Sequence, residues 1–141
     1  MSTRESPAMG GCQCGAVRYE LRGAPLVLLV CHCRECRKQS ASAFGISVIV
    51  NAGDVSLVSG QTRCWARPAD SGGAVECHFC PTCGSRLWHA GNRIPGRLSL
   101  KGGSLDDPPD LSTAVHIWVS RKLPGVVLPP GARCYPEEPP R

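Results

Sequence analysis

Closely spaced cysteines are the feature that most restricts how this chain can fold. Ten of its 141 residues are cysteines, and most of them fall in three short motifs. Residues 1–11 contain no apolar stretch that could act as a signal peptide, so we expect a cytoplasmic protein whose thiols stay reduced. Reduced cysteines in close pairs are most often metal ligands, and the sequence therefore predicts metal binding.

The segment Cys80-Pro81-Thr82-Cys83-Gly84 carries the clearest of these motifs. Two cysteines separated by two residues can hold one metal ion from a tight turn, and the following glycine permits a backbone that points amide N–H groups at the sulfurs. Because this pair supplies only half of a tetrahedral site, we expect Cys12 and Cys14, on a glycine-flanked loop, to supply the rest. The four thiolates are predicted to form a structural zinc site; unpaired buried thiols or a disulfide are the alternatives.

A second cluster places Cys31, Cys33 and Cys36 close together, directly after an apolar run. Three protein ligands with a free fourth position are typical of a catalytic zinc, where water or a thiol can bind and lose its proton. A fourth protein ligand would instead make the site structural, and the spacing alone leaves both arrangements open. The candidates for such a ligand are His32, Cys64, Cys77 and His78. With the first site, this cluster predicts two Zn²⁺ ions per chain.

Three basic residues, Arg34, Arg37 and Lys38, accompany the second cluster. They could bind the carboxylates of an anionic substrate, since Arg can bind a carboxylate through two hydrogen bonds. Alternatively, they offset the charge of a three-thiolate zinc site or face solvent. The formal net charge of +5 falls to +2 once two Zn²⁺ and seven thiolates are counted, and aromatic residues make up only 5% of the chain. We therefore expect no nucleic-acid partner.

The rest of the chain has the pattern of short strands. Apolar and polar residues alternate, as half-buried strands require, in Val17–Leu21, Val75–Phe79, Leu98–Leu100 and Val115–Val119. The runs Leu26–Val30 and Ile46–Val50 are more continuously apolar and fit central strands. Only Arg34–Ser42 looks helical, so the sequence predicts a mainly β fold.

The predicted domain organisation is simple. We expect one zinc-binding domain over residues 10–135, between a loose N-terminal segment (1–9) and a loose, Pro- and Glu-rich C-terminal tail (136–141). No segment approaches the ~20 apolar residues that a membrane-spanning helix needs, so we expect no membrane partner. The sequence gives no indication of the oligomeric state.

Four further polar residues are open to a structural or a catalytic interpretation. His89 and His116 are interpreted as hydrogen-bonded strand histidines rather than catalytic bases. Asp106 and Asp107 are interpreted as turn residues, because adjacent residues of a strand face opposite sides and cannot form a carboxylate pair.

Five segments in order along the chain resemble the glutathione-dependent formaldehyde-activating enzymes, a family shared with centromere protein V whose fold is Mss4-like. The segments are Gly10–Tyr19, Cys31–Arg37, Phe79–Ser85, Gly103–Pro108 and His116–Val119. The resemblance implies antiparallel sheets packed around the zinc sites. It also implies a structural zinc on Cys12, Cys14, Cys80 and Cys83, and a catalytic zinc on Cys31, Cys33 and Cys36.

The activity that this resemblance implies is that of a carbon–sulfur lyase, in which formaldehyde and the thiol of glutathione form S-hydroxymethylglutathione. A small thiol such as glutathione is then the expected partner. A thiol bound to zinc is ionised, and His32 and His78 are candidates to carry protons. Two positions depart from the family pattern: Ala41 replaces a frequent glycine, and Pro124-Gly125 replaces a frequent tryptophan. The alternative function is a non-enzymatic zinc-binding scaffold or interaction domain, because the same architecture also serves such roles.

Overall fold

The computed structural model describes residues 7–69, 72–91 and 95–140. Over these residues the chain forms ten strands, one α-helix and four short 3₁₀ helices. The strands are β1 (Ala8–Gly11), β2 (Arg18–Leu21), β3 (Val27–Cys31), β4 (Gly45–Asn51), β5 (Val55–Ser59), β6 (Arg63–Pro68), β7 (Ala74–Phe79), β8 (Arg86–Gly91), β9 (Arg97–Lys101) and β10 (Val115–Ile117). The helices are α1 (Arg34–Ser40), η1 (Ala52–Asp54), η2 (Gly102–Ser104), η3 (Leu111–Thr113) and η4 (Val119–Arg121).

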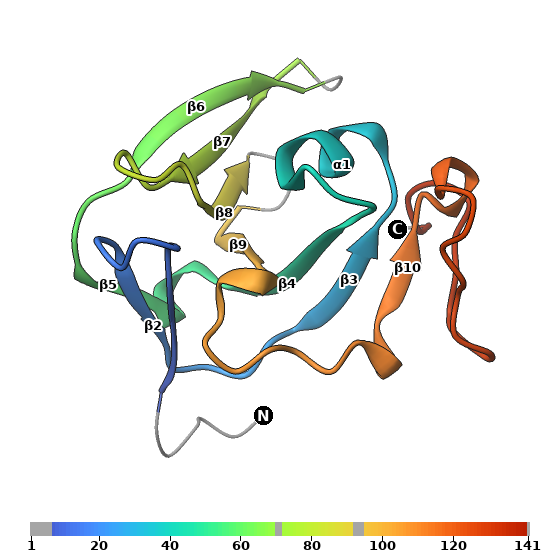
Figure 1. Cartoon of the computed structure of the whole chain (residues 1–141), viewed down its shortest axis with the longest axis horizontal. Helices are drawn as coiled ribbons and strands as arrows, with labels where there is room; N and C mark the ends of the chain where they lie inside the picture. The colour runs from blue at the N-terminus through green and yellow to red at the C-terminus, as the bar shows by residue number, and fades with distance from the viewer. Residues whose placement is uncertain (1–6, 70–71, 92–94, 141) are drawn as a thin grey trace.

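The strands form two sheets. The small sheet has the order β1-β2-β5, and the large sheet has the order β10-β3-β4-β9-β8-β7-β6 (Figure 1). Neighbouring strands run antiparallel except β10, which pairs parallel to β3. The predicted mainly β fold with antiparallel sheets is thus confirmed, and the parallel β10–β3 pair is an addition that the sequence pattern did not indicate.

The main core lies between the small sheet and one face of the large sheet. Tyr19 and Leu21 of β2 are fully buried there, while Arg18 and Glu20, which alternate with them, are not. The ring of Tyr19 meets that of Trp88 edge-on, at a centroid distance of 6.0 Å. Their partners from the large sheet include Val48, Val50, Leu87 and Leu100. Burying each of these side chains contributes about 1.5–3 kcal/mol, so the core holds the two sheets together.

The single α-helix, α1, begins and ends at unusual residues. The side chain of Cys33 caps its N-terminus by accepting a hydrogen bond from the N–H of Cys36, and the helix lies against β4. The helix ends at Ala41, whose φ of 51° and ψ of 42° are left-handed. An L-residue pays about 1–2 kcal/mol for this conformation, and glycine is the usual residue at such a helix end. The departure from the family pattern at residue 41 therefore falls on a strained position.

Both chain ends differ from the loose segments that the sequence predicted. Ala8 and Met9 belong to β1 and pair with β2, while residues 1–6 lie outside the described residues. At the other end, the N–H groups of Trp118 and Ser120 donate to the carbonyls of Glu137 and Pro136, at 3.1 and 3.2 Å. Left-handed Trp118 (φ 57°) ends β10 and frees these N–H groups, so the tail fastens beside η4 instead of hanging free.

Within the described part of the chain, no helix is long and apolar enough to cross a membrane.

Candidate metal centres and the adjoining cleft

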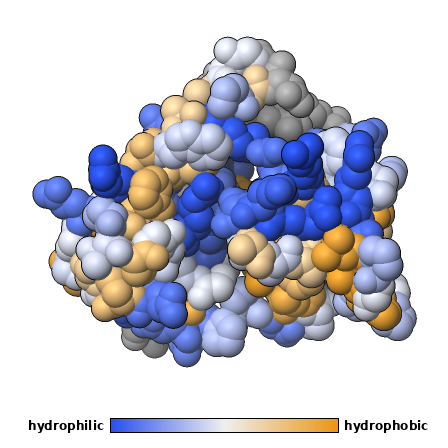
Figure 2. All heavy atoms as spheres, turned by 45° about the horizontal axis from the view of Figure 1, so that its top comes forward, coloured by the Kyte–Doolittle hydropathy of each residue, from blue (hydrophilic) through white to orange (hydrophobic). Residues whose placement is uncertain are grey.

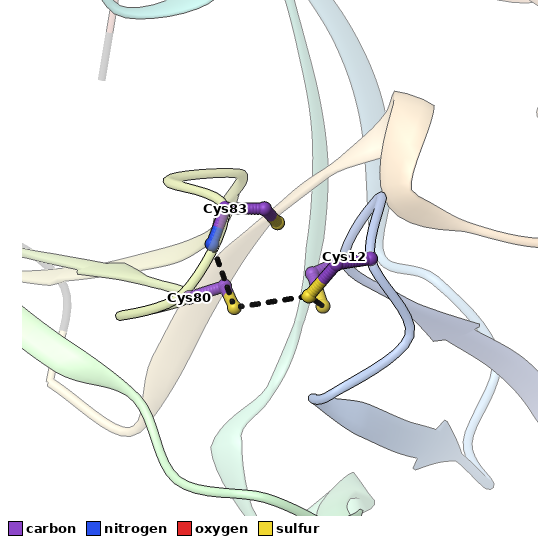
Figure 3. Close-up of side chains that lie close together, drawn as sticks. Cys12, Cys80 and Cys83 are labelled. Carbon is purple, nitrogen blue, oxygen red and sulfur yellow. Dashed lines mark hydrogen bonds between the residues drawn. The ribbon is translucent and has the colours of Figure 1, made fainter.

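Four cysteines from two distant loops meet at one point. Cys12 and Cys14 come from the β1–β2 loop, Cys80 and Cys83 from the β7–β8 loop, and their sulfurs all lie within 4.8 Å of one another (Figure 3). The Cys12–Cys14 and Cys14–Cys80 sulfur distances are 3.6 and 3.8 Å. A tetrahedral zinc with Zn–S bonds of about 2.3 Å has S–S edges of about 3.8 Å. The donor set and its spacing therefore fit a zinc ion.

Hydrogen bonds hold these sulfurs in place. The N–H of Val17 donates to the Cys12 sulfur at 3.2 Å, and the N–H of Thr82 donates to the Cys80 sulfur at 3.4 Å. The hydroxyl of Ser85 accepts a hydrogen bond from the N–H of Gln13 at 3.0 Å and lies 3.3 Å from the Cys83 sulfur. Hydrogen bonds from Ser85, and further N–H donors, lower the pKa of Cys83 to about 5. Cys83 is thus prepared to act as a thiolate ligand.

The second cluster is built from the end of β3 and the start of α1. The sulfurs of Cys31, Cys33 and Cys36 lie within 4.8 Å of one another, and the N–H of Cys36 points at the Cys33 sulfur from 3.4 Å. Hydrogen bonds from the Cys31 and Cys36 thiols lower the pKa of Cys33 to about 2. The pKa of Cys31 is raised far above its usual range, because it donates to its neighbours and is buried. The three sulfurs share one negative charge, so a divalent cation is needed for all three to ionise.

The proposed fourth ligands do not join this cluster among the residues that the structure describes. His32 Nε2 lies 3.0 Å from Nδ1 of His116, so the ring points to β10. His78 contacts the hydroxyl of Thr62 at 3.0 Å and stacks on Trp88. Cys77 is fully buried in β7, and Cys64 is exposed on β6. Neither His32 nor His78 is among the residues that line the cavities beside α1, described below.

The basic residues of α1 lie mostly away from the thiols. Arg34, Arg37 and Lys38 line a shallow hollow of about 390 Å³ that is not lined by a cysteine. Of the three, only Lys38 also lines the hollow of about 160 Å³ into which Cys36 opens. The structure therefore does not bring Arg34 and Arg37 to the thiol cluster's opening.

Of the other residues around this opening, Trp65, Arg67 and Arg86 were not found from the sequence, and His89 is interpreted there as a structural strand histidine. Trp65, Arg67, Arg86 and His89 line the hollow with Cys36. They come from β6 and β8, and strand register explains their meeting: Trp65 pairs with Cys77, which pairs with His89, so all three share one face of the sheet. No motif spacing marks them; only the pairing of strands places them together.

A larger cleft of about 750 Å³ adjoins this hollow. Gln39 and Arg86 line both spaces, so these two side chains lie between them. The cleft is also lined by Cys83 and Ser85 at the four-cysteine site and by Lys101 at the end of β9. The cleft therefore opens at the four-cysteine site, and it meets the hollow at Cys36 only at the side chains of Gln39 and Arg86.

A protein-family model described as glutathione-dependent formaldehyde-activating enzyme matches residues 7–121. The chain belongs to this family. The match includes all seven clustered cysteines, and it confirms the resemblance seen in the sequence. A crystal structure of a Rhodobacter sphaeroides protein is similar to this formaldehyde-activating-enzyme fold with a TM-score of 0.56 and 20% identity. The alignment covers 90% of this chain and 98% of that one, which supports the shared fold.

Proposed function

We propose that this protein is a zinc-dependent carbon–sulfur lyase acting on a small thiol, with glutathione as the first candidate, and formaldehyde. The observation that carries the proposal is the grouping of Cys31, Cys33 and Cys36 within 4.8 Å beside a cleft, with no fourth protein ligand in their group among the described residues. Three thiolate ligands and one free position are typical of a catalytic zinc. Family membership supports formaldehyde and glutathione as the substrates.

The two cysteine clusters are proposed to have different roles. Zinc on Cys12, Cys14, Cys80 and Cys83 would be structural, because that site joins two loops that are far apart in the sequence. Zinc on Cys31, Cys33 and Cys36 would supply the Lewis acidity that ionises a thiol at the free position. The protein itself would bind the thiol in the cleft and orient its sulfur.

The proposed reaction forms one bond and moves one proton. The thiol sulfur attacks the carbon of formaldehyde and forms the C–S bond. The π-electron pair of the carbonyl moves to oxygen, which takes up a proton equivalent to the one that the thiol lost. The product is an S-hydroxymethyl thiol, and the reverse sequence releases formaldehyde.

Two histidines that the sequence suggested as proton carriers have other roles in this arrangement. His32 faces His116, and His78 contacts Thr62 on the side of Trp88.

The test uses zinc-loaded protein with glutathione and formaldehyde. Exchange between free formaldehyde and S-hydroxymethylglutathione, followed by NMR exchange spectroscopy, should be faster with the protein than without it. Cys33→Ala should abolish the acceleration, whereas Cys134→Ser, at an exposed cysteine outside both clusters, should keep it. Cobalt-substituted protein should change its thiolate-to-metal absorption on adding glutathione. No acceleration and no cobalt response would favour the zinc-binding scaffold instead.

A further inference from the structure

Lys101 is a buried cation without an acidic partner. The residue is only 9% exposed, and Nζ donates hydrogen bonds to the hydroxyls of Ser47 and Ser99, at 3.2 and 3.1 Å. Among the described residues no carboxylate forms an ion pair with it. Lysine is almost never this buried unless it is paired, and two neutral hydroxyls do not balance its charge. An ammonium has three N–H donors, so one remains for a ligand.

Strand pairing places Lys101 near the thiol cluster. Ser47 of β4 lies directly opposite Lys101, and Gly45, two residues earlier on the same face, lies opposite Cys31. A Cβ on Gly45 would be 3.4 Å from the Cys36 sulfur, so this sulfur lies over Gly45. Two residues along a strand span ~7 Å. The ammonium is therefore about one such step from the thiols, and it lines the large cleft.

Arg86 is a second cation held in place without an ion pair. Its guanidinium lies over the ring of Trp65, 5.7 Å from the centroid, and Nη1 lies 3.0 Å from Nε2 of His89. Burial and the nearby cations Lys101 and Arg86 lower the pKa of His89 to about 2, so this histidine is neutral and accepts the hydrogen bond. Arg86 lines both the cleft and the hollow at Cys36. It is pre-oriented, with donors left for a ligand.

The acidic groups along these spaces are already engaged. Asp106 pairs with Arg18, whose Nη1 donates to it at 3.0 Å, and Glu35 lies 3.8 Å from Arg67. Among the described residues, no carboxylate of the lining is therefore paired with Lys101 or Arg86; the anionic groups near Lys101 are the Cys36 and Cys31 thiolates. The face that comes forward when the view of Figure 1 is tipped toward the reader carries hydrophilic side chains across its middle (Figure 2). A cleft with this balance favours an anion.

We propose that Lys101 and Arg86 bind a carboxylate of an anionic thiol, with its sulfur directed at Cys36, and so select anionic over neutral thiols. This inference rests on the proposed function and deepens it. It moves substrate recognition from Arg34 and Arg37, which line a separate hollow, to residues of β8 and β9 that line the cleft. Neither cation touches the reacting atoms; both position the substrate.

The experiment compares glutathione with its diethyl ester, which keeps the thiol and loses both carboxylate charges. Calorimetric titration of zinc-loaded protein should give an affinity for glutathione about tenfold or more above that for the ester. Arg86→Gln and Lys101→Met should each remove most of this preference, while the affinity for the ester stays near that of the wild type. Arg34→Gln, at the separate hollow, is the matched control and should keep the full preference.

The outcomes separate the two proposals. Equal affinity of the wild type for glutathione and ester, or a preference that survives Arg86→Gln and falls with Arg34→Gln, would overturn this inference and leave the lyase proposal standing. No binding of either thiol to the wild type would overturn the proposed function, and the inference with it. Zinc content and circular dichroism of each variant confirm its fold; where buried Lys101→Met fails to fold, the Arg86→Gln and Arg34→Gln pair decides.

Discussion

The N–H of Gln13 donates a 3.0 Å hydrogen bond to the hydroxyl of Ser85, and this hydroxyl also lies 3.3 Å from the Cys83 sulfur. One side chain thus links the two loops of the four-cysteine site and contacts one of its sulfurs. Neither atom of this bond belongs to a proposed metal ligand side chain. Ser85 therefore acts on both the geometry and the ionisation of the site.

Ser85→Ala should make the site lose zinc at a higher pH. The Ser85 hydrogen bonds are the largest cause of the lowered pKa of Cys83, about 5 against a usual 9.0. A lowered pKa stabilises the folded apoprotein above pH 9, and this contribution is lost as the pH falls toward 5. Without the hydroxyl, the pKa of Cys83 rises, so protons displace zinc from this thiolate at a higher pH. A chromogenic chelator followed against pH measures the release; Ser85→Thr, which keeps a hydroxyl, should release zinc as the wild type does.

Cys83→Ser should unfold the protein or sharply lower its melting temperature. The free energy of zinc binding to structural sites is folding free energy, on the order of 10–16 kcal/mol in small zinc peptides. Cys83 belongs to the cluster that joins the loop before β2 to the loop before β8. Thermal unfolding and zinc content measure the effect, with Cys134→Ser as an exposed control. A folded Cys83→Ser protein that still holds two zinc ions would exclude this site.

Cys33→Ala should lose one zinc of two and keep the fold. Cys31, Cys33 and Cys36 lie at the junction of β3 and α1, so they cross-link no distant segments, and the four-cysteine site remains intact. Losing the Cys33 cap should cost α1 about 1 kcal/mol. Inductively coupled plasma mass spectrometry and circular dichroism give metal content and fold. Global unfolding of this variant would instead mean that the second zinc is structural, as in a scaffold.

Local chemistry explains why so much of the candidate site could be predicted. The close spacing of Cys12/Cys14 and Cys80/Cys83 and the glycines beside them indicate metal ligands. The structure brings all four cysteines together. The strands that alternate strictly, such as the Tyr19–Leu21 part of β2, could be predicted because one of their faces is buried.

Long-range pairing explains what could not be predicted. Lys101 and Arg86 carry no local motif, and they border one cleft only because β9 and β8 are neighbours in a seven-stranded sheet. Arg34 and Arg37 are closer to the thiols in sequence, yet they line a separate hollow to which no cysteine contributes. The carbonyl of Glu137 accepts a hydrogen bond from the N–H of Trp118, whose backbone is left-handed. No sequence pattern predicts this left-handed residue.

Ala41→Gly should stabilise the protein by about 1 kcal/mol. Ala41 has a φ of 51°, and this left-handed conformation costs an L-residue about 1–2 kcal/mol, which glycine avoids. Glycine also raises the conformational entropy of the unfolded chain, which offsets part of this gain in stability. Chemical denaturation of the zinc-loaded protein measures the difference. Ala43→Gly is the matched control: among the described residues, Ala43 is not one of the non-glycine positions with positive φ, so glycine there should destabilise. A destabilised Ala41→Gly would show that the loop gains more from its methyl group than it loses in strain.

His89→Gln should make the protein less sensitive to mild acid. Burial, and then the neighbouring cations, hold the pKa of His89 at about 2 in the folded chain, against an ordinary 6.5 when unfolded. A histidine whose pKa is lowered on folding favours the unfolded state as the pH falls below 6.5, because the unfolded chain then binds more protons. Between pH 7 and 5.5, His89 should cost the wild type about 1 kcal/mol of stability. Glutamine can still accept the Arg86 hydrogen bond but does not titrate. Denaturation midpoints at the two pH values should therefore differ less in the variant, and equal pH dependence in both proteins would mean that His89 is already charged in the fold.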